Sequence, residues 1–298
     1  RNTQVLSPAE FFEMQAKNAE GVYLYDPALP ATINVATMLA SLNKGVVAHP
    51  DLAARICANT PAENLSGRWK TAAEAYEWAF AELWPKMNHR MLACYHPDPR
   101  MTGLSDYLIR NRVFTFWVTD ATKDPDAAAK ERAVAEKVFS ASPPNVPVLG
   151  FWYSDSDAGL SEYEGVGLAG EYGKITVVSD WASNCSVLGG IKVDLIPVVK
   201  AYRERTTVLT PPFDPTRVYI AFNVVESGDA PSYLETRQIN MWDDPARGSA
   251  PINWGFGLGI VELMPPIAEY YLETATPNDH LFAAISGAGY VHPFRSFM

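Results

Sequence analysis

Short runs rich in Val, Ile, Tyr and Phe recur along the chain and alternate with polar segments. Most of these runs are continuously apolar rather than alternating, which is the pattern of strands buried on both faces of a mainly parallel sheet. The pattern predicts eight strands, within GVYLYDP, GVVAHPD, RMLACYHPD, RVFTFWVTD, VPVLGFWYSD, KITVVSDWA, RVYIAFNVVESGD and HLFAAISGAG.

Segments with apolar residues at helical spacing separate several of these strands. TAAEAYEWAFAELWP has this spacing, and Thr71 and Glu74 stand in the register of a capping box at its start. DPDAAAKERAVAEKVF begins with Asp124 as the expected N-cap and continues with a proline at the first helical position. Alternating strands and helices predict an α/β fold with a mostly parallel sheet.

One stretch has the composition of a linker. SASPPNVP, residues 140–147, combines prolines with polar residues between a charged helix and a new apolar strand. We therefore expect a surface boundary here, between an α/β region over residues 1–141 and a second region over residues 146–298.

Acidic residues follow several of the predicted strands. Asp120 ends FWVTD, Asp180 ends TVVSD, and Glu226 and Asp229 end AFNVVESGD. In α/β sheets the ligand site lies beyond the C-terminal ends of the strands, so these carboxylates are candidates for chemistry. The alternative is that each caps a helix or shapes a turn, as Asp often does.

Paired carboxylates beside aromatic rings are what glycoside hydrolysis needs. One carboxylic acid with a raised pKa protonates the leaving oxygen, while a second carboxylate attacks or activates water. Trp152, Trp181 and Trp254 are candidates to stack on sugar faces, although a Trp in so aromatic a chain also suits the core.

Other chemistries have weaker support. The chain lacks the G-x-S-x-G motif of serine hydrolases, and GFGLG, residues 255–259, does not follow a convincing strand, which disfavours dinucleotide binding. His49 and His96 each precede a Pro-Asp pair, where they could ligate a metal but more simply begin a turn or helix. Three distant cysteines indicate neither a disulfide framework nor a zinc site, so we expect no metal and no cofactor.

Charge and composition narrow the partners. The net charge of -10 argues against nucleic acid, and no apolar segment is long enough for a membrane span. The absence of an initial Met predicts a processed or trimmed N-terminus. A carbohydrate is the expected partner, a homo-oligomer is compatible with the sequence, and we expect a secreted or extracytoplasmic location.

The C-terminal stretch SGAGYVHP resembles the signature of the GxGYxYP glycoside hydrolase family, with His292 where the family has a tyrosine. Four further stretches look like the same family, so the resemblance covers nearly the whole chain: YLYDPALPATINVATMLASLNKGVVAHPDLA, VVSDWASNCSV, INMWDDPARGSAPINWGFG and PPIAEYYLETATPNDHLF. It implies a Rossmann-like α/β N-terminal region and a partial, β/α-barrel-like catalytic region. The family continues beyond its signature, so we expect this chain to be a segment of a longer protein.

This resemblance, together with the strand-end carboxylates, predicts a glycoside hydrolase. Asp229, Glu226 and Asp180 are the catalytic candidates. We expect them to share one pocket with substrate-binding side chains, namely Asp279, Tyr290, His292 and at least one of the three tryptophans. Ser227 and Ala230 depart from the acidic Gly-Asp-Asn run of the family, which favours the alternative of a non-catalytic carbohydrate-binding or assembly-forming protein that keeps the fold.

Overall fold

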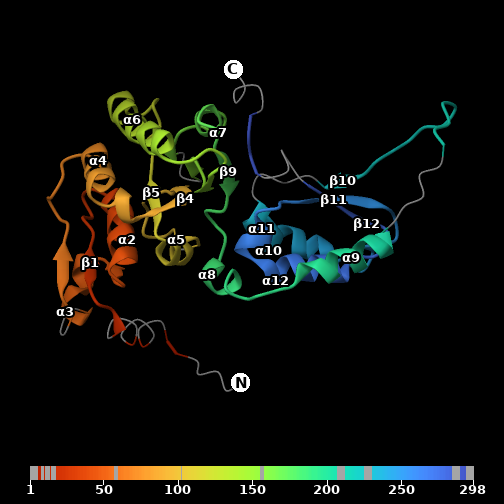
Figure 1. The fold of residues 1–298 in the computed structure, drawn as a ribbon, viewed down its shortest axis with the longest axis horizontal. Coiled ribbons are helices and arrows are strands. Elements are labelled where there is room, and N and C mark those ends of the chain that lie inside the picture. The colour runs from red at the N-terminus through yellow and green to blue at the C-terminus, as the bar shows by residue number, and fades with distance from the viewer. Residues whose placement is uncertain are drawn as a thin grey trace.

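The computed structural model describes residues 18–56, 60–101, 103–154, 158–206, 212–224, 230–283 and 289–292, together with Leu6, Ser7, Glu10 and Met14. Within these residues the chain forms three parallel sheets and one short antiparallel ribbon. The sheets follow one another along the molecule, and helices pack against each of them (Figure 1).

The first sheet has the strand order β2-β1-β3, and both pairings are parallel. Its central strand is buried throughout, as its continuous apolar run predicts. The strands are β1 (Val22–Leu24), β2 (Val46–Ala48) and β3 (Ala62–Asn64), and the helices of this part are α2 (Thr32–Leu42), α3 (Ala53–Ile56) and α4 (Ala72–Glu82), with 3-10 turns at Pro50–Leu52 and Trp84–Lys86.

The central sheet has the order β5-β4-β6-β9, again wholly parallel. A helix lies between each pair of successive strands, so this sheet is built from β-α-β units. The strands are β4 (Asn88–Cys94), β5 (Val113–Phe116), β6 (Pro147–Gly150) and β9 (Ile175–Val178); the helices are α5 (Ser105–Asn111), α6 (Pro125–Ala141), α7 (Glu162–Glu171) and α8 (Cys185–Leu188). The ribbon β7 (Tyr153–Ser154) and β8 (Ala158–Gly159) follows β6.

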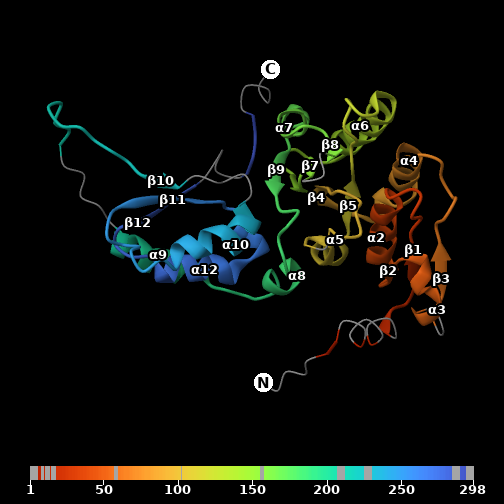
Figure 2. The same ribbon diagram turned by 180° about the vertical axis from the view of Figure 1, so that it is seen from behind.

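The third sheet has the order β10-β11-β12 and is also parallel. Figures 1 and 2 show its helices together on one side of the strands. The strands are β10 (Asn223–Val224), β11 (Ile252–Phe256) and β12 (Asp279–Ala283), and the helices are α9 (Leu195–Thr206), α10 (Ala230–Trp242), α11 (Ile260–Leu263) and α12 (Pro265–Thr274).

Helix α2 joins the first and central sheets through one hydrophobic core. The Thr115 backbone N–H on β5 lies 3.5 Å from the Met38 sulfur on α2. The buried Asn34 amide donates to the Tyr76 hydroxyl at 3.1 Å and to the Tyr95 carbonyl at 3.0 Å. These contacts fix α2 and α4 against the C-terminal end of β4.

The predicted helix starts are confirmed. Asp124 caps α6 by accepting from the Ala127 N–H at 3.0 Å, and a proline begins the helix. Thr71 caps α4 by accepting from the Glu74 N–H at 3.2 Å. The Glu74 carboxylate reaches one residue further back than a capping box requires, to the Lys70 N–H at 2.8 Å.

The α/β class with mostly parallel sheets is confirmed, and each of the eight apolar runs contains a strand. Among the described residues of RVYIAFNVVESGD, 217–224, the strand is limited to Asn223–Val224, and Val218 and Ile220 before it are highly exposed. Strand β11 was not predicted, because INWGF mixes an amide and a glycine with its apolar residues. It includes Gly255, the first glycine of GFGLG, but the helix that follows, α11, is only four residues long.

The segment SASPPNVP connects α6 to β6, with Pro143 and Pro144 exposed. Because β6 pairs with β4, both ends of this segment belong to the central sheet. The boundary predicted between residues 141 and 146 therefore falls within one sheet. Among the described residues, none of the helices combines the length and the apolar character that a membrane span requires.

Candidate active site

The loop that follows β9, residues 179–184, carries Asp180 at the C-terminal end of a parallel strand, and we call it the β9 loop. Asp180 is 6% exposed, whereas the neighbouring Trp181 is 48% exposed. The Ser179 hydroxyl ties the loop to β6 by accepting from the Gly150 N–H at 3.0 Å. A Cβ at Gly103 would come within 2.7 Å of the Asp180 carbonyl oxygen, so the segment before α5 packs directly on the loop.

Two carboxylates from different helices bind this part of the chain. Asp106, in the first turn of α5, accepts a hydrogen bond from the Ser186 N–H at 3.0 Å and another from the Ser186 hydroxyl. Glu235 on α10 accepts from the Ser183 N–H at 2.9 Å. Both side chains are half-buried. The β9 loop and the start of α8 thus bring together two acids that lie 129 residues apart in the sequence, from 106 to 235.

The two acids differ in their electrostatic surroundings. Burial raises the pKa of Glu235, and the nearby charge of Asp106 raises it further, while the hydrogen bond from Ser183 partly offsets both effects. The Oδ1 atom of Asp106 is buried and has no hydrogen-bond partner among the described residues. The site therefore contains one carboxyl group that holds its proton more tightly than usual, beside a carboxylate with an unused oxygen.

Neighbouring groups cannot take over this proton chemistry. Burial raises the pKa of the Cys185 thiol to about 12, with contributions from the charges of Asp106 and Glu235. Burial likewise raises the pKa of Tyr95 to about 12. Both groups stay protonated near neutral pH, so Cys185 supplies no thiolate nucleophile. Within the described parts of the chain, no three His, Cys, Asp or Glu side chains gather closely enough to hold a metal ion.

Two of the three predicted platform tryptophans belong to the core. Trp152 has no exposed surface, and its indole N–H donates to the Thr176 hydroxyl at 3.1 Å. Trp254 is 3% exposed and donates to Asp279 at 2.9 Å. Protein atoms cover these rings, so the expectation that they stack on a ligand is corrected. Trp181 keeps an exposed ring.

Asp279 is also a structural residue. It lies at the first position of β12, away from the carboxyl end of the strand, and is fully buried. Its Oδ2 atom pairs with Arg247 at 2.5 Å and accepts from the Thr276 N–H at 2.8 Å. Since these partners and Trp254 occupy the carboxylate, the predicted contact with substrate is corrected here as well.

Tyr290 lies beside the amino-terminal half of β9, and His292 packs against α7. Tyr290 and Thr176 exchange backbone hydrogen bonds of 2.7 and 3.2 Å, and the Tyr290 hydroxyl bonds to Glu162 at the start of α7. The His292 ring packs against Tyr163, with ring centroids 4.7 Å apart.

The described members of the predicted pocket therefore do not converge. Tyr290 pairs with Thr176, which lies four positions before Asp180. Four positions span roughly 13 Å along an extended chain. Asp279 belongs to another sheet. Glu226 and Asp229 lie outside the described residues, so the structure neither adds them to the site nor removes them.

Three domain models of one family match the chain. They are "GxGYxYP_N second domain" over residues 19–87, "GxGYxYP third domain" over residues 89–190, and "GxGYxYP putative glycoside hydrolase C-terminal domain" over residues 216–297. The chain belongs to the GxGYxYP family. The family resemblance of the sequence is thereby confirmed.

A solved structure has the same fold. It is described as "a putative hydrolase from Bacteroides thetaiotaomicron VPI-5482", and it superposes with a TM-score of 0.74 at 18% sequence identity. The match covers 96% of this chain and 52% of that one, so our chain spans about half the length of this similar protein. No curated protein matches the chain.

The family domains divide the site between them. Asp106 and the β9 loop belong to the GxGYxYP third domain, whereas Glu235 belongs to the C-terminal domain. The two carboxylates are therefore brought together only by the contact between these two domains.

The GxGYxYP signature has a structural role at the same domain boundary. A Cβ at Gly289, the second glycine of the signature, would lie 2.6 Å from the Thr176 carbonyl oxygen and 2.7 Å from Ile175. The signature can therefore pair with β9 only because this position lacks a side chain.

Gly289→Ala is expected to lower the free energy of unfolding by about 1–3 kcal/mol, because the added methyl group overlaps backbone that cannot move aside. Urea unfolding measures this loss, and hydrogen exchange at Tyr290 shows whether its N–H leaves Thr176. Gly21→Ala is the matched control, since every Cβ contact there is 3.4 Å or longer. Equal stability of the two variants would contradict the close contact.

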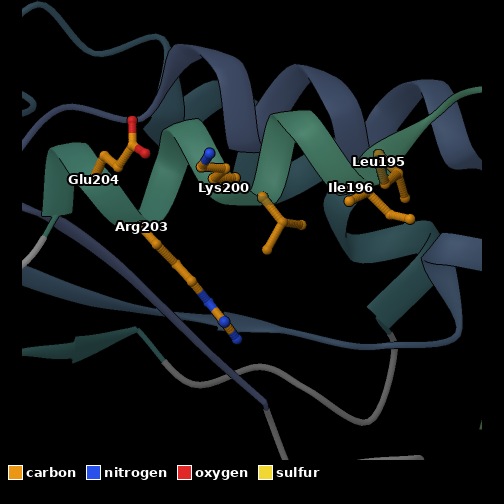
Figure 3. A pocket seen from close by; sticks show the side chains of 6 residues that line it. Leu195, Ile196, Lys200, Arg203 and Glu204 are labelled. Carbon is orange, nitrogen blue, oxygen red and sulfur yellow. The ribbon is translucent and has the colours of Figure 1, made fainter.

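A depression of about 530 Å³ runs along α9. Leu195, Ile196, Lys200 and Arg203 line it, all from this one helix (Figure 3). Arg203 and Glu204 extend to opposite sides of the helix. The charged residues among its described lining all come from α9, so the β9 loop, where acids from two helices meet, is the better candidate.

Sequence reasoning missed both Asp106 and Glu235. They lie within helical segments, LSDYLIRN and SYLETRQ, rather than after apolar runs. Nothing in either segment shows that α5 and α10 meet at the β9 loop.

Proposed function

We propose that this chain hydrolyses glycosidic bonds at the β9 loop, with Glu235 as general acid and Asp106 as its carboxylate partner. The observation that carries the proposal is the proximity of these two acids: burial and the nearby charge of Asp106 raise the pKa of Glu235, so Glu235 holds its proton more tightly than an ordinary glutamic acid. Glu235 would protonate the glycosidic oxygen, and Asp106 would attack the sugar or activate water. The exposed ring of Trp181, next to Asp180, is placed to contact a sugar.

The family supports this reaction class, since its C-terminal domain is described as a "putative glycoside hydrolase C-terminal domain". Asp180 shares the β9 loop and is the remaining carboxylate there, so we keep it as a second candidate for nucleophile or base. Glu226 and Asp229 stay candidates from the sequence. Asp229→Asn tests the latter directly: activity that survives this change removes Asp229 from the mechanism.

The proposed roles predict a particular pH dependence. The acid must carry a proton, so kcat/KM is expected to fall as pH rises through the pKa of Glu235, which lies above the ordinary glutamic acid value. Asp106→Asn removes the neighbouring negative charge and is expected to lower that pKa.

Carbon-13 NMR titration of the Glu235 carboxyl in wild type and Asp106→Asn measures this change without any substrate. Hydrolysis of a glycan panel across pH then tests the reaction itself. An unchanged Glu235 pKa in Asp106→Asn would show that the two acids are not coupled, and the proposed pair would be abandoned.

One observation favours a second function. Asp106 and Glu235 both accept backbone N–H groups near the β9 loop, which is also what purely structural carboxylates do. A carbohydrate-binding protein without catalysis would need nothing more. Saturable binding of glycans that wild type never cleaves at any pH would favour this alternative over hydrolysis.

A further inference from the structure

A separate cavity of about 260 Å³ lies between the first and central sheets. Residues that follow β4 and β5, such as His96 and Trp117, form one side, and Pro30 and Ala72 contribute from the segment after β1 and the start of α4. The strand order β5-β4-β6-β9 places this cavity toward the opposite edge of the central sheet from the β9 loop. It therefore does not belong to the site of Asp106 and Glu235.

The cavity presents an aromatic wall with an available imidazole. The rings of His96 and Trp117 meet edge to face, with centroids 4.8 Å apart. No hydrogen bond joins the His96 imidazole to another residue in the described part of the chain. Burial lowers the pKa of His96, and the charge of Asp98 offsets this only partly, so the ring is neutral near pH 7 and can both donate and accept.

A comparison with His49 shows that, of these two histidines, only His96 directs its imidazole into the cavity without a hydrogen bond to a described residue. Both histidines precede a Pro-Asp pair, and both pack edge-on against an aromatic ring. The Nδ1 atom of His49, however, accepts from the Asp51 N–H at 3.1 Å and caps a 3-10 turn. His96 has no such local task, and its ring lines the cavity instead.

Two acids add polar groups of different character. Asp120 accepts from the Thr122 N–H and hydroxyl, both at 2.8 Å and both through Oδ1, and these bonds lower its pKa. Its other oxygen has no hydrogen bond to a described residue. Glu131 is 4% exposed and accepts from the Thr119 N–H at 2.6 Å, and burial raises its pKa.

We infer that this cavity binds one neutral, polyhydroxylated ring, the size of a single sugar residue. Its volume is below the roughly 300–1,000 Å³ of pockets for larger ligands. The apolar side chains of the lining, such as Leu29 and Pro30, suit the C–H face of such a ring, while Asp120 and His96 suit its hydroxyl groups. The two acids disfavour an anion, and Lys123 on the same lining disfavours a cation.

Isothermal titration calorimetry with glucose, galactose, mannose, xylose and N-acetylglucosamine tests this inference on the whole chain. At least one sugar is expected to bind saturably. His96→Ala, which removes a polar contact, and Ala72→Phe, which fills the cavity, are each expected to weaken that binding at least tenfold. His49→Ala is the matched control and is expected to bind like wild type, and thermal unfolding confirms that each variant is folded.

Glu235→Gln separates this inference from the proposed function, because it is expected to lower kcat for hydrolysis by about 10²–10⁴-fold while leaving the binding of the free sugar unchanged. Three results would overturn the inference: no saturable binding of any of the five sugars, equal binding by wild type and both cavity variants, or loss of binding in Glu235→Gln. Preferential binding of choline would likewise overturn it, since the cavity would then select a cation.

Discussion

Glu235→Gln is expected to lower kcat for glycoside hydrolysis by about 10²–10⁴-fold, the usual contribution of a general acid. Glutamine keeps the shape of the side chain and a carbonyl oxygen that can accept from the Ser183 N–H, but it has no acidic proton to give. The loss should be smallest for substrates with good leaving groups, which need little protonation. Steady-state kinetics with aryl glycosides of graded leaving-group pKa measures both effects.

The exposed Glu273 provides the control for this experiment. Glu273→Gln makes the same chemical change on α12 and is expected to leave kcat within twofold of wild type. Asp106→Asn should lose activity comparably to Glu235→Gln, since each acid serves the same reaction. Full activity in Glu235→Gln with an unchanged melting temperature would refute its role as the acid.

Arg247→Ala is expected to reduce the free energy of unfolding by about 3–5 kcal/mol, because it leaves a buried carboxylate without its counter-charge. Asp279 is fully buried and pairs with Arg247 at 2.5 Å, and the guanidinium also lies 4.3 Å from the centre of the Trp242 ring. Equilibrium unfolding in urea measures the loss. Lys44→Ala breaks a pair of similar length, 2.7 Å, whose side chains are exposed, and should cost at most about 1 kcal/mol.

A second variant and the pH dependence of stability test whether the unpaired charge of Asp279 causes this loss. Adding Asp279→Asn to Arg247→Ala removes the unpaired charge but keeps an acceptor for Trp254, so part of the stability should return.

Burial alone would raise the pKa of Asp279, but its hydrogen bonds and Arg247 lower this pKa overall. The pair therefore stabilises the fold above about pH 3.9, and this stabilisation is lost as pH falls through the lowered pKa. A loss below 1 kcal/mol at pH 7 would contradict this account.

Much of the fold follows from local sequence. A parallel strand covered on both faces must be continuously apolar, so β1, β5 and β9 could be read directly from the chain. Strand β11 could not be predicted in this way, because Asn253 and Gly255 interrupt its apolar run. What holds it in the sheet is its pairing with β10 and β12, which the local sequence does not show. The boundary predicted at residues 141–146 lies within the central sheet, because prolines mark a turn but do not show that β6 pairs with β4.

The candidate site could be predicted only in part. The position of Asp180 at the end of a strand could be predicted, because the end of an apolar run is visible in the sequence whatever the order of the strands in the sheet. Trp254 and Asp279 were interpreted as ligand groups, although they hydrogen-bond each other in the core, because sequence does not reveal which polar partners a buried residue will meet. The pairing of Asp106 with Glu235 could not be predicted, because it depends on the contact between two family domains, which only the folded structure shows.

The pairing of Tyr290 with Thr176 also affects how copies of this protein behave toward one another. Strand β9 is the last strand of the central sheet, and such a strand offers unpaired N–H and C=O groups to any extended chain nearby. The signature occupies part of that edge from within the same molecule. A change that releases it would therefore expose a template for intermolecular strand pairing, so the glycine that names the family also guards against aggregation.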